Sequence, residues 1–197
     1  MTLDVLTQRQ MARRERIIRA ALELATEGGY DAVQMRDVAA RADVALGTIY
    51  HYFSSKDHLL AATLLQWTID FEHEVAAVPP VGDTLLDRVL DLLRRSTREM
   101  RRFERLSAAV VTGFTSPGPE IAACQFEVHA VFSRYLSAAF GDEVDADTRT
   151  KIIRTLEHVW YSGLVGWTFG WVTLAQAIDE LEDAARLVLA RRDQNAF

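Results

Sequence analysis

The side chains best suited to chemistry lie together near the N-terminus, and that chemistry is hydrogen bonding to a polyanion. Residues 46–52 carry hydroxyl, phenol and imidazole groups that can bond phosphate oxygens and base edges: Thr48, Tyr50, His51 and Tyr52. Gly47 leaves room for a duplex to approach the backbone closely. Lys56 adds a positive charge beside the N–H groups that open the next helix, which suits a phosphate. This stretch therefore predicts a contact with nucleic acid.

The charge distribution is compatible with a small basic footprint on an acidic protein. The net charge is −6, yet residues 1–60 balance 8 basic against 8 acidic side chains, so residues 61–197 carry the whole excess. Gln8–Arg19 contains a single glutamate beside five arginines: Arg9, Arg13, Arg14, Arg16 and Arg19. We expect these arginines to lie across flanking phosphates, with Arg36 placed to reach the groove or the backbone.

The elements that must position these side chains form a predicted helix-turn-helix. A first helix has apolar residues at helical spacing (Ile17, Ile18, Ala21, Leu22 and Ala25) and is expected to end at Gly28-Gly29. Two short apolar clusters, Met35–Ala42 and Leu46–Phe53, then flank a turn at residues 43–45. Ile49 is expected in the core, and Tyr50 and Phe53 could be core residues as well as contact residues.

Helical periodicity continues through the rest of the chain, which predicts an all-α protein of about nine helices. Ser54 with Asp57, and Thr173 with Gln176, have the spacing of capping boxes. Pro79-Pro80 and residues 116–119 predict breaks between helices. The predicted division is a head of three helices with the helix-turn-helix at residues 1–56 and a larger helical body at residues 57–197.

Several other classes of protein are disfavoured. Cys124 is the only cysteine, so neither a disulfide framework nor a cysteine-based zinc site is expected, and the histidines lack ligand spacing. No paired carboxylates, phosphate-binding glycine loop or nucleophile set is present, so we expect no enzyme and no cofactor. The uncharged run Val159–Ile178 is long enough to cross a bilayer, but its glycines favour a buried helix followed by a turn. With no secretion signal either, a cytoplasmic protein is expected.

The head resembles the TetR family of transcriptional repressors. The resemblance covers residues 14–62 and is carried by residues 29–33, Val38-Ala39 and the run from Gly47 to Lys56. It implies that residues 1–56 form a DNA-binding domain and that residues 57–197 form a domain for ligand binding and dimerisation. It also implies a homodimer on a palindromic double-stranded DNA operator, with recognition helices about 34–36 Å apart. The positions that match the family's DNA contacts are Arg36, Ala45, Gly47, Thr48, Tyr50, His51, Tyr52 and Lys56.

A narrower resemblance is to the repressors of steroid catabolism within that family. It rests on Gln34-Met35-Arg36, residues 41–45 and Val159-Trp160, while Leu46, His51 and Ser54 depart from that pattern. The resemblance implies a repressor released by a small hydrophobic effector, such as a steroid or fatty acyl-CoA thioester. The alternatives are a regulator of efflux or of another pathway, and a lipid-binding module that lacks sequence-specific DNA binding.

The family resemblance also implies an effector pocket among the aromatic residues of the body. Without it, aromatic residues at helical spacing are more often ordinary core. The expected apolar lining, typical of a site for a hydrophobic ligand, is Trp67, Phe71, Met100, Val110, Phe114, Phe126, Phe132 and Trp160. Polar candidates are Gln125, His129 and Tyr161, each of which could equally be a satisfied core or surface side chain.

Three glycines, Gly163, Gly166 and Gly170, are expected in one helix, where each costs about 1 kcal/mol relative to alanine. Such a set indicates a close approach to that backbone, either by a partner or within the chain. Because the family resemblance implies dimerisation through the last two helices, the expected interface consists of Gly163, Leu164, Trp167, Leu181 and Val188, with Trp160 beside them.

A second basic cluster lies in the body, between Arg94 and Arg105. It could be a solvated helix face paired with acidic neighbours, or a site for a phosphate or carboxylate of the effector.

Overall fold

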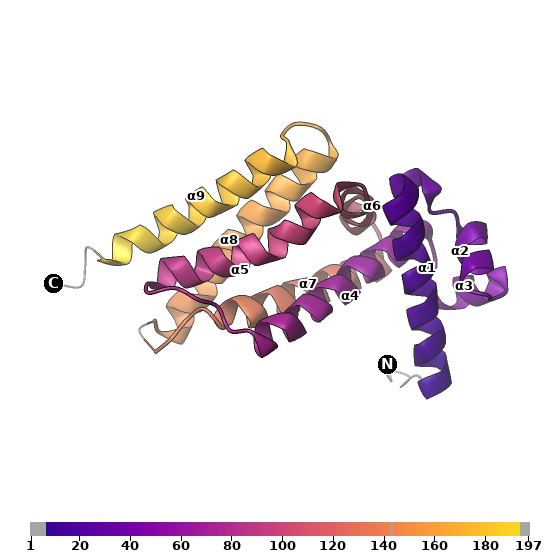
Figure 1. Ribbon diagram of the computed structural model, residues 1–197, viewed down its shortest axis with the longest axis horizontal. Coiled ribbons are helices and arrows are strands. Elements are labelled where there is room, and N and C mark those ends of the chain that lie inside the picture. Colours follow the sequence, from indigo (N-terminus) through magenta and orange to yellow (C-terminus); the bar gives the residue numbers. More distant parts are fainter. Residues whose placement is uncertain (1–6, 143, 194–197) are drawn as a thin grey trace. The chain divides into compact units, whose positions relative to one another are not determined.

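The computed structural model describes residues 7–142 and 144–193, without the side chains of residues 190–193. Within these ranges the chain forms nine helices and no strand (Figure 1): α1 Gln8–Ala32, α2 Met35–Arg41, α3 Leu46–Tyr52, α4 Lys56–Ala77, α5 Leu85–Arg102, α6 Glu104–Thr115, α7 Pro119–Ser137, α8 Ala146–Thr168 and α9 Leu174–Asp193. The all-α prediction is confirmed. Two of the predicted breaks coincide with helix ends: α4 stops before Pro79-Pro80, and α7 begins at Pro119, the first-turn position that proline favours.

One predicted capping box is confirmed and the other is displaced by a residue. At α9, the Thr173 N–H donates to Gln176 Oε1 (2.8 Å) and the Gln176 N–H donates to Thr173 Oγ1 (3.2 Å). At α4, the predicted pair of Ser54 and Asp57 is wrong. Ser55 is the capping residue, since its Oγ accepts the His58 N–H at 3.0 Å. The His58 ring reaches back to accept the Ser54 N–H (3.2 Å), because Asp57 is engaged elsewhere.

The chain divides into two compact units that alternate along the sequence. Unit 1 contains the residues up to Leu64 together with Phe103–Cys124, and unit 2 contains Leu65–Arg102 and the residues from Gln125 onward. Unit 1 therefore includes α6 and the first turns of α4 beside the helix-turn-helix. The predicted functional division at residue 56 stays a prediction, since compact packing and function need not share a boundary.

Unit 1 is built around the apolar face of α1, which packs against α2 and α6. Ile17, Ala21 and Ala25 are fully buried, whereas Leu22 is only half-buried and Leu24 takes its place in the core. The predicted glycine stop is a kink: Gly29 adopts a φ of 71°, which glycine tolerates, and one further helical turn follows before α2.

Unit 2 packs α8 and α5 against α9 around a core of aliphatic and aromatic side chains. The prediction of three glycines in one helix is wrong for Gly170, which lies beyond the end of α8 in the turn to α9, with a φ of 77°. A Cβ atom at Gly163 would lie 3.1 Å from the Ala177 Cβ, so close packing within the chain explains this glycine. Among the described residues, no helix is long and apolar enough to cross a membrane.

Candidate functional sites

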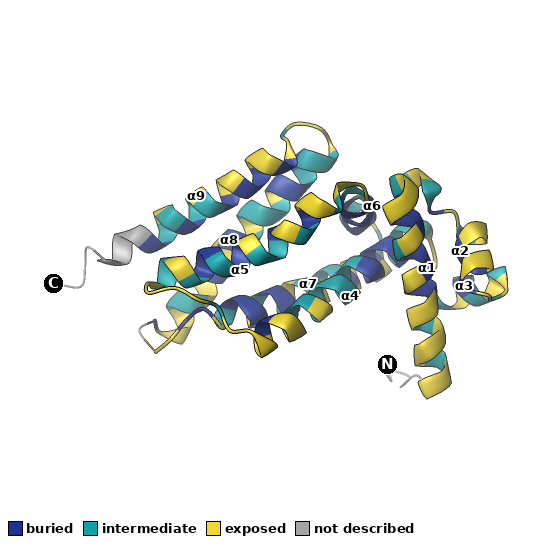
Figure 2. Ribbon diagram, in the orientation of Figure 1, coloured by how far each residue is buried: buried dark blue, intermediate teal, exposed yellow. Residues whose placement is uncertain are grey.

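Helix α3 has one anchored face and one outward face. Ile49 is fully buried and Phe53, just past the helix, is 1% exposed, which confirms Ile49 and Phe53 as core residues. Tyr50 is 53% exposed. These residues have modest helix propensity, so the two apolar anchors hold a helix that its own sequence would support poorly. The exposed side of α3 is thereby fixed in orientation (Figure 2).

The predicted DNA contacts all lie in unit 1, on α2, on α3 with its capping residue Ala45, and on the first turn of α4. The exposed members of the set are Arg36, Ala45, Gly47, Tyr50 and His51, and the half-buried members are Thr48, Tyr52 and Lys56. A Cβ atom at Gly47 would meet nothing within 4 Å, so this glycine has no packing reason within the chain. The fold therefore presents the whole set on neighbouring elements, with Gly47 open to an incoming molecule.

Lys56 is held in place by its neighbours at the start of α4. Its Nζ donates to the Tyr30 carbonyl oxygen (3.1 Å) and lies 3.6 Å from the centre of the Tyr30 ring. The Tyr30 hydroxyl donates to Asp57 Oδ1 at 2.6 Å, and burial together with this carboxylate raises the pKa of Tyr30 to about 12. This cluster ties the end of α1 to the start of α4.

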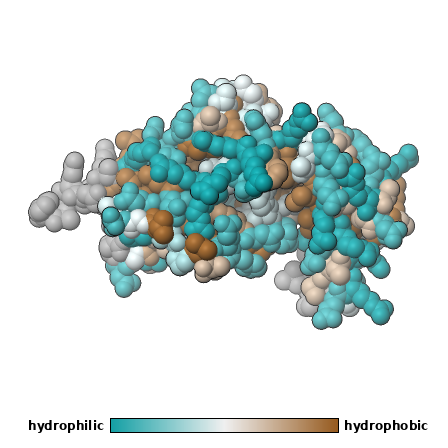
Figure 3. Space-filling view, viewed as in Figure 1, coloured by the Kyte–Doolittle hydropathy of each residue, from teal (hydrophilic) through white to brown (hydrophobic). Residues whose placement is uncertain are grey.

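The arginines of α1 divide into two kinds. Arg14 is half-buried, with its guanidinium 5.4 Å from the centre of the Phe53 ring, and burial lowers its pKa. It therefore covers the core beneath α3, in contrast to the predicted phosphate contact. Arg9, Arg13, Arg16 and Arg19 are exposed, and the surface over α1 is mostly hydrophilic in this view (Figure 3). These four remain candidates for phosphate contacts.

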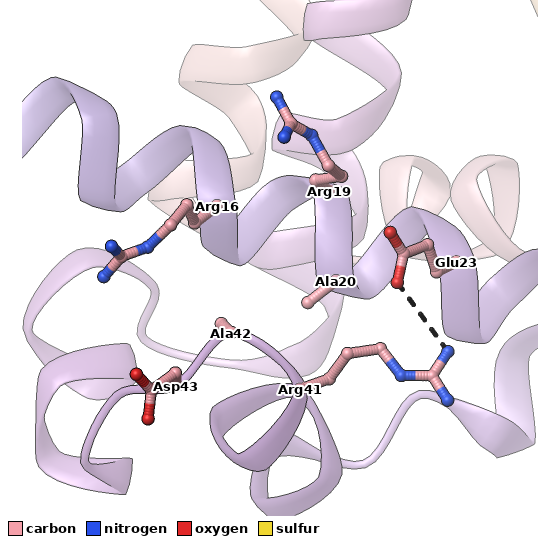
Figure 4. Close-up of a pocket in the computed structure, with 7 residues that line it drawn as sticks. All are labelled: Arg16, Arg19, Ala20, Glu23, Arg41, Ala42 and Asp43. Carbon is pink, nitrogen blue, oxygen red and sulfur yellow. Dashed lines mark ion pairs between the residues drawn. The ribbon is translucent and has the colours of Figure 1, made fainter.

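A hollow of about 350 Å³ lies between α1 and the turn that follows α2, and the sequence did not predict it (Figure 4). Its lining consists of Arg16, Arg19, Ala20, Glu23, Arg41, Ala42 and Asp43. Arg41 donates to both Glu27 oxygens at 2.6 and 3.1 Å and lies 3.9 Å from Glu23. The pairing spans 14 residues, so no local spacing rule could have found it. These contacts make Arg41 a brace between α1 and α2.

The predicted pocket residues do not all share one environment. Val110 and Phe114 are buried in unit 1, while the other six belong to unit 2. Phe71, Phe132 and Trp160 share one core cluster of unit 2. Trp67 is half-buried and Met100 is 8% exposed. Phe126 is 73% exposed, so a single chain does not enclose it.

A carboxyl group that the sequence analysis missed lies against this cluster. The Glu157 side chain on α8 is 11% exposed, and its Oε1 atom is buried without a hydrogen-bond partner. Its other oxygen lies 3.8 Å from His129 Nδ1. Burial raises the pKa of Glu157 to about 7. The available signal was an acidic residue between Leu156 and Trp160 on a face with otherwise apolar residues.

The predicted interface residues are partly used within the chain. Gly163, Leu164 and Leu181 are buried in unit 2, whereas Trp167 and Val188 are half-buried. Large apolar side chains are exposed close by in sequence: Phe169 (68%), Trp171 (74%) and Leu187 (73%). The Phe169 and Trp171 rings stack, with centroids 5.7 Å apart.

In the basic cluster between Arg94 and Arg105, three arginines of α5 lie beside acidic groups. Arg94 donates to both oxygens of Glu182 on α9, at 3.0 and 2.8 Å. Arg95 lies near Glu74 and Asp91, and Arg102 lies near Glu99. These pairs favour the solvated, ion-paired interpretation over an anion site. Within the described part of the chain, no group of three or more His, Cys, Asp or Glu side chains could hold a metal ion.

Comparison with known proteins gives two family matches that together cover most of the chain. The profile described as bacterial regulatory proteins, tetR family, matches residues 17–63, and that of the tetracyclin repressor-like C-terminal domain matches residues 82–188. The HTH-type transcriptional repressor KstR of Rhodococcus jostii is 36% identical over 94% of this chain and 87% of its own length. KstR of Mycolicibacterium smegmatis is 33% identical over 95% of this chain and 92% of its own length.

Solved structures agree with this match. A TetR transcriptional regulator from Rhodococcus sp. RHA1 has a TM-score of 0.79 and 30% identity, covering 92% of this chain and 98% of its own. FadR of Thermus thermophilus, a repressor solved with lauroyl-CoA, has a TM-score of 0.67 and 22% identity, covering 89% of this chain and 93% of its own. At 22% identity, the similarity to FadR shows that the two proteins share a fold.

Proposed function

Because the chain belongs to the TetR family of bacterial regulatory proteins, we propose that it is a ligand-responsive transcriptional repressor. It binds a palindromic operator as a homodimer and is released by a hydrophobic effector, a steroid or fatty acyl-CoA thioester. The observation that carries the proposal is α3, whose buried Ile49 fixes an outward face of hydrogen-bonding side chains. Polar side chains of this kind are unfavourable in a protein core, whereas the major groove of DNA accepts a helix that presents them.

The operator contact has two parts. Thr48, Tyr50 and His51 contact base edges and nearby phosphates, and Gly47 lets the duplex approach the backbone of α3. The exposed arginines of α1 neutralise flanking phosphates, which makes the affinity depend on salt. The acidic remainder of the chain disfavours binding elsewhere on its surface, so the footprint is confined to the head.

Release is proposed to act through α4, because unit 1 locks the first turns of this helix to its neighbours. Tyr30 bonds Asp57, and a Cβ atom at Gly113 of α6 would lie 2.6 Å from the Leu60 Cβ. With so little space, a displacement of the start of α4 carries α1 and α6 with it. An effector that favours the displaced state weakens DNA binding, and DNA weakens effector binding by the same coupling free energy, typically about 1–3 kcal/mol.

The effector is proposed to be hydrophobic because the aromatic residues of unit 2 offer an apolar surface. Phe71 and Phe132 pack edge-to-face on Tyr135, with centroid distances of 5.1 and 5.0 Å. Trp160 is only partly buried against the same core. The fold accommodates an acyl thioester in Thermus thermophilus FadR, which was solved with lauroyl-CoA.

The homodimer proposal rests on the exposed apolar side chains of unit 2. Buried residues such as Leu181 have no area left to offer a partner, whereas Leu187, Phe169 and Trp171 do. Exposed aromatic side chains of this size mark contact surfaces more often than solvated ones. A second copy that covers them, with Trp167 and Val188 beside them, would form an interface through α8 and α9.

The test is fluorescence anisotropy of a labelled duplex from upstream of this protein's own gene, at two salt concentrations and against a scrambled duplex. We expect tight, salt-dependent binding to the native duplex. Tyr50→Ala should weaken it by about 10–100-fold, and Tyr50→Phe, which loses only the hydroxyl, by less. Equal weak binding to both duplexes, followed by failure of unbiased operator selection, would overturn the repressor proposal and favour a lipid-binding module.

A further inference from the structure

The carboxyl group of Glu157 in unit 2 has one oxygen that is buried without a hydrogen bond. That atom is Oε1, and the whole side chain is 11% exposed. Buried oxygen atoms in folded proteins are nearly always hydrogen-bonded, and an orphan of this kind destabilises the protein that carries it. The stability of the free protein therefore does not explain why this carboxyl group is present.

Pairing with His129 does not supply that reason. The His129 side chain is 46% exposed, and its Nδ1 lies 3.8 Å from Glu157 Oε2, beyond hydrogen-bond distance. Burial and the nearby His158 lower the pKa of His129, so the ring is mostly neutral at neutral pH. Arg154 lowers the pKa of Glu157, but its side chain is exposed and makes no hydrogen bond to Glu157 Oε1.

The helix that carries this carboxyl group contributes to an apolar cluster that includes several aromatic side chains. Leu156 and Trp160, on either side of Glu157 along α8, belong to the same core cluster as Tyr135, and the charge of Glu157 raises the pKa of Tyr135. Tyr135 makes no hydrogen bond to Glu157 Oε1, which has no partner. Trp160, one helical turn further along α8, is only partly buried. The unpaired Oε1 atom of Glu157 therefore lies close to aromatic side chains.

We infer that Glu157 is the polar recognition group for the effector: it hydrogen-bonds a hydroxyl or carbonyl oxygen on an otherwise apolar skeleton. This inference rests on the proposed function and specifies its ligand. A protonated carboxyl donates to a carbonyl oxygen, and a carboxylate accepts from a hydroxyl, so both oxygen-bearing forms are recognised. A site built to bond an oxygen discriminates strongly against the analogue that lacks it, because its own polar group is then left unpaired.

The experiment compares probes that differ by one oxygen. Intrinsic tryptophan fluorescence of the full chain is titrated with 5α-androstane, 5α-androstan-3β-ol and 5α-androstan-3-one, and with dodecane and dodecan-1-ol. We expect at least one skeleton to bind about tenfold more tightly when it carries the oxygen. Glu157→Leu should abolish that preference, and Glu157→Gln should reduce it. Glu127→Gln, which alters an exposed carboxylate on α7, is the control and should change nothing.

The melting temperature of the free protein separates this role from a structural one. Glu157→Leu removes the orphan oxygen, so we expect the melting temperature to rise by about 2–4 °C. A structural carboxyl predicts a fall. The inference is supported only if the preference is lost while the melting temperature holds or rises. It is overturned by a wild-type protein that shows no preference in either skeleton, by a preference that survives in Glu157→Leu, or by a fall in melting temperature.

Operator binding, measured separately, keeps the two proposals distinguishable. If the protein binds its operator but shows no preference for the oxygen-bearing probes, only the inference about Glu157 is overturned. A protein that recognises the oxygen but binds no operator keeps the inference and fails the proposed function.

Discussion

Helix α3 in unit 1 presents polar groups to solvent, whereas helix α8 in unit 2 buries one of its carboxyl groups. On α3 the apolar Ile49 points inward and Tyr50 points into solvent. On α8 the carboxyl of Glu157 is buried near aromatic rings. Outward polar groups cost a fold almost nothing, whereas an inward one without a partner costs stability. The head can therefore be recognised by its sequence motif. The chemistry of the body is indicated only by a buried oxygen that makes no hydrogen bond.

The largest expected effect concerns the two adjacent residues of α3. Ile49→Ala should lower the free energy of unfolding by about 2–5 kcal/mol, because Ile49 is fully buried. Tyr50→Ala should change that free energy by less than about 0.5 kcal/mol, since Tyr50 is half-exposed. Urea denaturation followed by circular dichroism measures both. A comparable loss in the two variants would mean that Tyr50 supports the fold, and the division into two faces would fail.

The next effect is the pH dependence that Glu157 gives to unit 2. The folded pKa of about 7 lies above the ordinary value of 4.5, so the folded state holds this proton more tightly than the unfolded state. Stability from this group is therefore present at acidic pH and falls as pH rises from about 5 through 7. At pH 8, Glu157→Leu should be more stable than the wild type by about 1–3 kcal/mol.

The measurement is thermal unfolding of both proteins between pH 5 and pH 8. The His129 ring, which faces Glu157 from α7, and Arg154 and His158 on α8 remain in both proteins, so the difference between the two curves isolates Glu157. Parallel curves would show that this carboxyl titrates normally and that the contrast with α3 is unfounded.

The smallest effect separates two glycines of unit 1. Gly47→Ala should raise stability by about 0.5–1 kcal/mol, because the added Cβ meets nothing within 4 Å and alanine favours a helix. It should nevertheless weaken operator binding, because the methyl group stands where the duplex approaches. Gly113→Ala, the matched control, should destabilise, since its Cβ would lie 2.6 Å from that of Leu60. Unchanged operator affinity in Gly47→Ala would place the duplex away from this residue.

Local signals in the sequence sufficed for most of the fold. The boundaries of α3 and the cap of α9 depend on residues within a few positions of one another, such as Thr173 and Gln176. The predicted cap of α4 was wrong by one residue for a tertiary reason. The hydroxyl of Tyr30, 27 positions away, donates to Asp57, and the His58 ring accepts the Ser54 N–H at the cap instead. A spacing rule sees only the local pair, and a distant partner can change which residue is free.

The sequence by itself determined the helices, the outward polar face of α3 and the family to which the head belongs, because periodicity and motif spacing are properties of neighbouring residues. Only the tertiary structure decided that Gly163 packs on Ala177, that Arg14 covers Phe53 and that the Oε1 atom of Glu157 is buried without a hydrogen bond. Burial depends on which helices meet. A glutamate on α8 is an ordinary surface residue until the packing of the helices buries it, and no local pattern records that burial.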